Sequence, residues 1–216
     1  MMLKALIFDM DGVLVDSMPY HAEAWKIVLG EMNIYIEHQD IYDIEGSNHE
    51  GVIRLMFQKA GKKPPKNFRE LANKKREIFE RINKIRPFYE IKEILPALKK
   101  RLKLGVVSGS DRKIVESILN NFFPDIFDVV VTGDDVIQGK PSPEPYLKAI
   151  EMLRLNKNEC IVIENSPFGV ESAKRAGVYC IAIPTYVKKH RLEQADMVLD
   201  NHTSLRKYLS IVHENC

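Results

Sequence analysis

Six short apolar runs, each the size of one strand, constrain the fold of this sequence more than any other feature. They are rich in Val and Ile and span residues 3–8, 104–107, 128–131, 160–163, 179–183 and 197–199. Near-continuous apolar strands are typical of parallel sheets that are covered on both faces. Strand and helix patterns alternate from about residue 87 onward. The sequence therefore predicts an α/β fold with a doubly wound parallel sheet.

Residues 17–86 interrupt this alternation, because no strand-like run as clear as the first appears there. One amphipathic stripe surrounds Trp25, where the spacing favours core packing, and a second lies between residues 71 and 82. Asn67 and Glu70 have the spacing of a capping box before the second stripe. We therefore predict a core of residues 1–16 and 87–216, with residues 17–86 inserted as a separate helical unit.

Helix ends in the core carry local signals. Ser142 before Pro143 and Ser166 before Pro167 each predict an N-cap followed by proline at the first helical position. Gly177 predicts a C-cap.

Composition excludes several classes of protein. The 216 residues carry a net charge of only +2, which provides no broad basic field for nucleic acid. The N-terminal apolar run meets Asp9 too early for a signal peptide or a membrane span. We expect a cytoplasmic protein, a monomer, with no nucleic-acid or membrane partner.

Polar residues follow several of the predicted strands, and ligands of open α/β sheets bind beyond the carboxyl ends of the strands. The residues concerned are Asp9, Asp11, Ser108, Gly109, Ser110, Lys140, Glu164 and Asn165. Clustered carboxylates repel one another unless a cation is present. Asp9, Asp11, Glu164 and Asn165 would suit a hard, oxygen-seeking ion such as Mg²⁺.

Such an ion, together with Lys140, would offset the charge of a bound phosphate group. Ser108 and the backbone N–H groups of Gly109 and Ser110 could hold the phosphate oxygens. Phosphoryl transfer is the chemistry that this set favours. Our hypothesis gives Asp9 the role of nucleophile and Asp11 that of general acid and base, with Gly12 allowing a sharp turn.

Four motifs closely resemble those of the haloacid dehalogenase-like superfamily, in particular its β-phosphoglucomutase-like branch. They are DMDGVLVDS from residue 9, Ser108 in VVSGS, Lys140 in GKPSPEPY and IENSPFGVESAKRAG from residue 163. The resemblance implies a Rossmann-like core, a helical cap inserted after the first strand, Mg²⁺ dependence and an aspartyl-phosphate intermediate. The second acid, Asp11, separates the chain from true dehalogenases. His21 matches a histidine near the cap hinge of this branch.

Two positions depart from the pattern of the branch. Asn165 stands where a second consecutive acid is usual, which removes a negative charge from the metal site. The mutases of the branch resemble one another in a Lys before a cap glycine and an Arg three residues after it. The matching stretch here, IEGSNH, has Glu45 and His49 at those two positions. Glu45 would repel a second phosphate, so a phosphatase is favoured over a sugar phosphate mutase.

The substrate expected from the family is a small phosphorylated metabolite such as a sugar or polyol phosphate, and Glu45 and His49 could line its entrance. A phosphoacceptor signalling module is a further alternative, since it also uses a strand-end Asp, an acidic metal site and a Lys. Asp11 and the long insertion favour an enzyme. Asn165 is the one hint of a catalytically weak binding protein.

Overall fold

A six-stranded parallel sheet forms the centre of the protein, whose computed structural model describes residues 2–215. The strand order is β3-β2-β1-β4-β5-β6, and every adjacent pair is parallel. The bounds are β1 Ala5–Asp9, β2 Lys103–Val107, β3 Val129–Val131, β4 Cys160–Glu164, β5 Tyr179–Ala182 and β6 Met197–Val198. All six predicted strands are confirmed. The direction of winding reverses at β1, between β2 and β4, where a doubly wound sheet opens a crevice.

Helices cover both faces of this sheet. One face packs against α5 (Tyr89–Lys92), α6 (Leu95–Lys99), α7 (Arg112–Phe122) and α10 (His202–Asn215), and the other against α8 (Glu144–Leu153) and α9 (Pro167–Ala176). Alternate residues of β1 enter the two apolar clusters, with Leu6 and Phe8 in the first and Ala5 and Ile7 in the second. Three 3₁₀ helices complete the core at Gly133–Asp135, Lys157–Glu159 and Lys189–Leu192.

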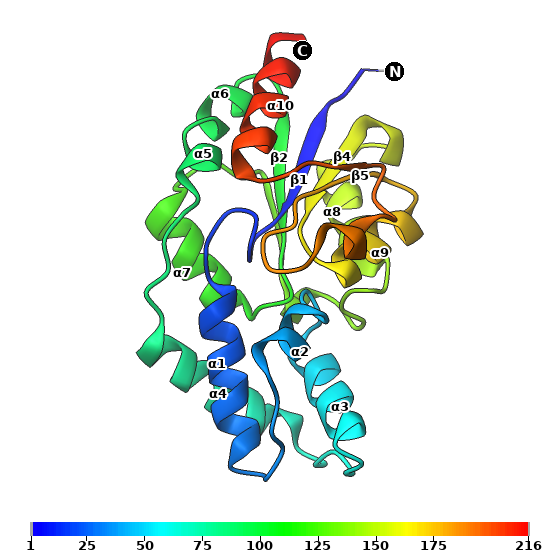
Figure 1. The fold of residues 1–216 in the computed structure, drawn as a ribbon. Helices are drawn as coiled ribbons and strands as arrows, with labels where there is room; N and C mark the ends of the chain where they lie inside the picture. The colour runs from blue at the N-terminus through cyan, green and yellow to red at the C-terminus, as the bar shows by residue number, and fades with distance from the viewer. Residues whose placement is uncertain (1, 216) are drawn as a thin grey trace.

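The inserted segment folds as a helical cap beyond the carboxyl ends of the strands (Figure 1). Its helices are α1 (Met18–Gly30), α2 (His38–Tyr42), α3 (His49–Lys59) and α4 (Phe68–Ile82). They share an apolar cluster of their own, in which Trp25 is buried as predicted. The two connections to the core lie side by side, since Asp16 N donates to Arg86 O at 2.9 Å. Of the helices described within residues 2–215, none is long and apolar enough to cross a membrane.

The structure confirms some of the predicted helix ends and contradicts others. Ser166 accepts a hydrogen bond from Gly169 N, and Gly177 has a φ of 71°, so both caps are confirmed. The predicted start of α8 was wrong by one residue, because the first helical hydrogen bond reaches Pro143 O and not Ser142 O. The predicted capping box was also wrong. Asn67 precedes α4, but its side chain makes no capping bond, with a ψ of 85° that departs from the extended cap conformation.

Candidate active site

The turn after β1 places two buried acids at the centre of the sheet edge. Asp9 ends the strand, and Asp11 follows one residue later, with exposed fractions of 2% and 6%. Gly12 then turns the chain with a φ of 87°, a conformation that favours glycine. A Cβ atom at Gly12 would lie 2.2 Å from Asn165 Nδ2, so the turn also packs directly on the start of the fourth motif.

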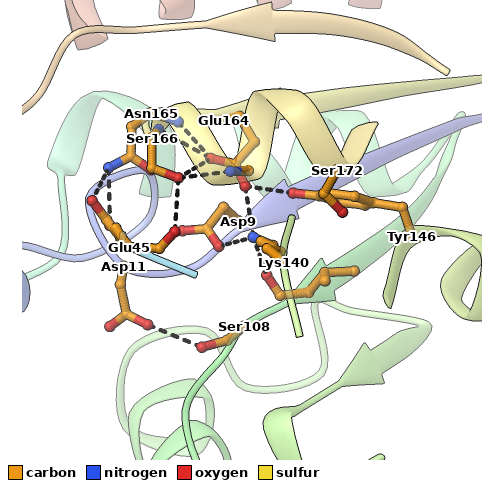
Figure 2. Close-up of polar contacts among 12 residues, drawn as sticks. Asp9, Asp11, Glu45, Ser108, Lys140, Tyr146, Glu164, Asn165, Ser166 and Ser172 are labelled. Carbon is orange, nitrogen blue, oxygen red and sulfur yellow. Dashed lines mark hydrogen bonds and ion pairs between the residues drawn. The ribbon is translucent and has the colours of Figure 1, made fainter. Parts of the chain in front are cut away.

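Lys140 lies between two carboxylates in the buried part of the site (Figure 2). Its Nζ is 2.5 Å from Asp9 Oδ1 and 2.6 Å from Glu164 Oε1. Burial alone would lower the lysine pKa, but the two carboxylates raise it above its ordinary value. The pKa of Asp9 is raised above its ordinary value, mainly by burial. The negative charges of Glu164 and Asp11 raise it further, and Lys140 only partly offsets these effects. Lys140 is therefore a fixed positive charge beside Asp9.

Glu164, at the end of β4, is held by partners on both oxygens. Besides Lys140, Oε1 accepts a hydrogen bond from the Tyr146 hydroxyl at 2.6 Å. Oε2 accepts from the backbone N–H groups of Asn165 at 2.8 Å and Ser166 at 3.2 Å. Tyr146 was not among the predicted site residues, because it follows a proline on an apolar helix face and resembles ordinary core. The arrangement makes Glu164 the residue that fixes Lys140 and the start of α9.

Asp11 belongs to a second group of contacts, formed by hydroxyls and a histidine. It accepts hydrogen bonds from Ser17 Oγ at 2.5 Å, Ser108 Oγ at 2.9 Å and Ser110 Oγ at 3.5 Å. His21 Nε2 lies 3.2 Å from its Oδ1. Burial opposes ionisation of Asp11, but His21 and the hydroxyls lower its pKa to about 2. Asp11 is thus a carboxylate in this state, aligned beside Asp9.

Lys75 is a site residue that the sequence did not predict. It lies on α4 with an exposed fraction of 1%, and its Nζ is 2.6 Å from His21 Nδ1. The ammonium also lies 4.9 Å from the centre of the Phe79 ring. Burial lowers its pKa to about 8. Because α4 is rich in charged residues, the sequence offered no signal that this one lysine points inward.

Glu45 closes the site from the cap. Asn165 Nδ2 donates to both Glu45 oxygens at 3.0 Å, and Ser166 Oγ donates to the Glu45 carbonyl at 3.2 Å (Figure 2). Burial, with the nearby charge of Asp9, raises the Glu45 pKa well above its ordinary value. The cap loop also touches the core backbone, since a Cβ atom at Gly109 would lie only 2.6 Å from Gly46 O.

The predicted site residues therefore meet around one pocket at the junction of cap and core. Its lining includes Asp9, Asp11, His21, Glu45, His49, Lys75, Gly109 and Ser110. His49 contacts the core through Asp111, and its ring packs edge-on against Trp25 at 5.6 Å. Lys140, Glu164 and Asn165 join the same network behind Asp9.

Two oxygen atoms of this network fit a hard cation. Asp9 Oδ2 and Asn165 Oδ1 are buried, and neither has a hydrogen-bond partner within residues 2–215. Carboxylate and amide oxygens are the donors that Mg²⁺ prefers. In the described part of the chain, no three His, Cys, Asp or Glu side chains are grouped as metal ligands. The two unpartnered oxygens therefore come from one carboxylate and one amide.

Comparison with known proteins agrees with this geometry. The family described as haloacid dehalogenase-like hydrolase matches residues 6–183. A phosphorylated carbohydrates phosphatase of Thermotoga maritima is 35% identical over 182 residues, covering 82% of each chain. A β-phosphoglucomutase of Bacillus subtilis is 26% identical and covers 98% of this chain and 95% of its own. A solved hydrolase of Pseudomonas syringae superposes with a TM-score of 0.88 at 26% identity, covering 96% of this chain and 98% of its own.

Proposed function

Because the chain belongs to the haloacid dehalogenase-like hydrolases, we propose that it is a Mg²⁺-dependent phosphatase of small phosphate monoesters that acts through an aspartyl phosphate on Asp9. One observation carries this proposal. Asp9 Oδ2 is buried and without a partner in residues 2–215, while Lys140 holds the other oxygen of the same carboxylate at 2.5 Å. A carboxylate fixed on one side and free on the other is suited to nucleophilic attack.

Asp9 and Asp11 have separate roles in the proposed reaction. Asp9 Oδ2 forms a bond to phosphorus while the bond from phosphorus to the ester oxygen breaks, and Asp11 protonates the departing alcohol. Water then attacks phosphorus while the bond between phosphorus and Asp9 Oδ2 breaks. Asp11 takes the proton of the water, and phosphate leaves. The pKa of Asp11, about 2 in this state, rises when a phosphate group brings negative charge beside it, so Asp11 takes up a proton from solvent before it donates one to the alcohol. Ser108 and the N–H groups of Gly109 and Ser110 hold the phosphoryl oxygens.

We assign Asn165 Oδ1 to Mg²⁺, because it is buried without a partner in residues 2–215, whereas Asp9 Oδ2 is the attacking atom. The predicted metal role of Asp9 would then fall to its Oδ1, which Lys140 contacts in this state. Asp11 and Glu164 stay proposed as further ligands. In this state hydroxyls contact Asp11, and Lys140, Tyr146 and backbone N–H groups contact Glu164, so these contacts would have to rearrange around a bound ion. When bound there, the ion would supply positive charge against the phosphoryl oxygens. Since an amide at Asn165 carries no charge, we expect weaker Mg²⁺ binding than a carboxylate at that position would give.

Glu45 favours a phosphatase over a mutase. Its carboxylate is buried, lines the pocket and lies beside Asn165. A mutase must hold a second phosphate on the same substrate, and a buried carboxylate at this point would repel it. The name of the Thermotoga maritima relative, a phosphatase of phosphorylated carbohydrates, supports a substrate of that class.

The test is phosphate release from a panel of small sugar and polyol phosphates, with and without Mg²⁺. Wild-type protein should turn over many times with Mg²⁺ and lose activity in EDTA, and Asp9→Asn should be inactive while folded. Asp43→Asn, a change outside the pocket in the loop after α2, serves as the matched control and should retain activity. Turnover that survives in Asp9→Asn would contradict the proposal, and a stable stoichiometric phosphoprotein would favour the signalling module.

A further inference from the structure

His49 extends from the cap into the pocket, and one of its two ring nitrogens lies beside a carboxylate of the core. Its Nδ1 lies 3.2 Å from Asp111 Oδ1. The other oxygen of Asp111 accepts a hydrogen bond from Arg76 at 3.2 Å, and Arg76 also donates to Asn73 at 2.7 Å. Asp111 comes directly after the Ser108-Gly109-Ser110 loop of the core. A core carboxylate is thus held between a histidine of α3 and an arginine of α4.

These contacts determine which nitrogen of His49 carries the proton. The negative charge of the Asp111 carboxylate lies 3.2 Å from Nδ1 and attracts a proton, so it favours the tautomer that is protonated at Nδ1. Burial and the positive charges of Lys75, His21 and Arg76 hold the His49 pKa well below its ordinary value, which favours the neutral ring. In a neutral ring with Nδ1 protonated, Nε2 is a hydrogen-bond acceptor only.

The acceptor nitrogen has no partner among residues 2–215, although it is buried. The His49 side chain has an exposed fraction of only 12%, and it lines the same pocket as Asp9 and Asp11. A buried acceptor without a donor costs free energy, which a ligand donor would recover. The Trp25 ring, edge-on at 5.6 Å, further restricts the orientation of the imidazole.

We propose that His49 Nε2 accepts a hydrogen bond from a hydroxyl of the departing alcohol, and that His49 thereby selects monophosphorylated polyols. The inference rests on the proposed phosphatase function. Asp111 and Arg76 are positioning residues, which fix the tautomer without touching the substrate. An acceptor here, together with the Glu45 carboxylate, disfavours a second phosphate, because phosphate oxygens are also acceptors.

Two three-carbon esters test the selection, namely glycerol 3-phosphate and propyl phosphate, which lacks the hydroxyls. Wild-type protein should prefer the glycerol ester in kcat/KM by up to about tenfold, the upper end for one neutral hydrogen bond. His49→Phe should lower that ratio by the same factor. His38→Phe, a change of a half-buried cap histidine outside the pocket that pairs with Glu23, should leave it unchanged. An unchanged ratio in His49→Phe would overturn the inference.

The tautomer is measured separately by ¹⁵N NMR of the histidine ring at pH 7. Wild-type His49 should carry its proton on Nδ1. Asp111→Asn should move it to Nε2, because a carboxamide can donate to Nδ1, and should lower the substrate ratio as His49→Phe does. A doubly protonated ring or a proton on Nε2 in the wild type would overturn the inference. Failure to hydrolyse either ester would instead contradict the phosphatase activity, and the two failures are therefore distinguishable.

Discussion

Replacing Asn165 by aspartate should destabilise the protein in the absence of Mg²⁺, because the new carboxylate would face Glu45. Asn165 Nδ2 now donates to both Glu45 oxygens at 3.0 Å, and both residues are buried. The substitution exchanges that donor for a negative charge. Two like charges about 4 Å apart repel by about 4 kcal/mol at an effective dielectric constant of about 20. Proton uptake by one carboxylate limits the loss, so we expect Asn165→Asp to cost about 2–4 kcal/mol at pH 7.

The assay is urea unfolding of four proteins at pH 7 in EDTA: wild type, Asn165→Asp, Glu45→Gln and the double variant. In the Glu45→Gln background, Asn165→Asp should cost at least about 2 kcal/mol less than it does in the wild type, because no charge opposes it. Millimolar Mg²⁺ should reduce the cost in the Glu45-containing protein, since the added carboxylate gains a cation. Asn120→Asp, an exposed change on α7, should stay within about 0.5 kcal/mol of the wild type.

A cost of Asn165→Asp that is the same with and without the Glu45 carboxylate would refute this reasoning. It would mean that the 3.0 Å contacts between Asn165 and Glu45 carry no electrostatic coupling between cap and core.

Three further substitutions test other parts of the site. Lys140→Gln leaves the buried carboxylates of Asp9 and Glu164 without their cation, and it should cost about 3–5 kcal/mol in urea unfolding at pH 7; a cost under 1 kcal/mol would contradict the assignment. Gly109→Ala places a Cβ 2.6 Å from Gly46 O, so the cap loop must shift away from the core, and phosphate release should fall at least tenfold together with a lower melting temperature; full activity at an unchanged melting temperature would contradict this close contact. The pKa of Lys75 is lowered to about 8 from 10.5 in the folded state, so the unfolded chain binds more protons between these values and stability should rise with pH in that window, by up to about 3 kcal/mol. Lys75→Met should remove that rise in pH-dependent urea unfolding, and an identical pH dependence in both proteins would contradict it.

The strands could be predicted because each is covered on both faces. Leu6 and Ile7 enter opposite apolar clusters, so β1 had to be apolar at consecutive positions from Ala5 to Phe8 and not at alternate ones. The position of Asp9 and Lys140 could be predicted for a related reason. Parallel strands end at one edge, so residues that follow different strands meet there. Helix ends were less predictable, as Ser142 and Asn67 show, because several local hydrogen-bond patterns compete at the first turn.

The contacts across the cap could not be predicted in the same way. Glu45 and Asn165 each departed from the family pattern, but they are 120 residues apart, and nothing local indicates that they pair. Lys75 lies in a charged stretch of α4, and only the packing of α4 against α1 places it beside His21. Asp111 has the sequence position of a helix N-cap, yet its carboxylate contacts His49 and Arg76. Tertiary packing of the cap determines all three.

The central claim is that a phosphoryl group passes through Asp9, and rapid acid quenching during turnover tests it most directly. The quenched protein is digested and its peptides are read by mass spectrometry, after borohydride reduction to mark the acyl phosphate. We predict a labelled Asp9 in the peptide that contains the first motif, at a level that rises when Asp11→Asn slows hydrolysis of the intermediate. Label on Ser108, or steady turnover with no label on Asp9 in either protein, would contradict the account.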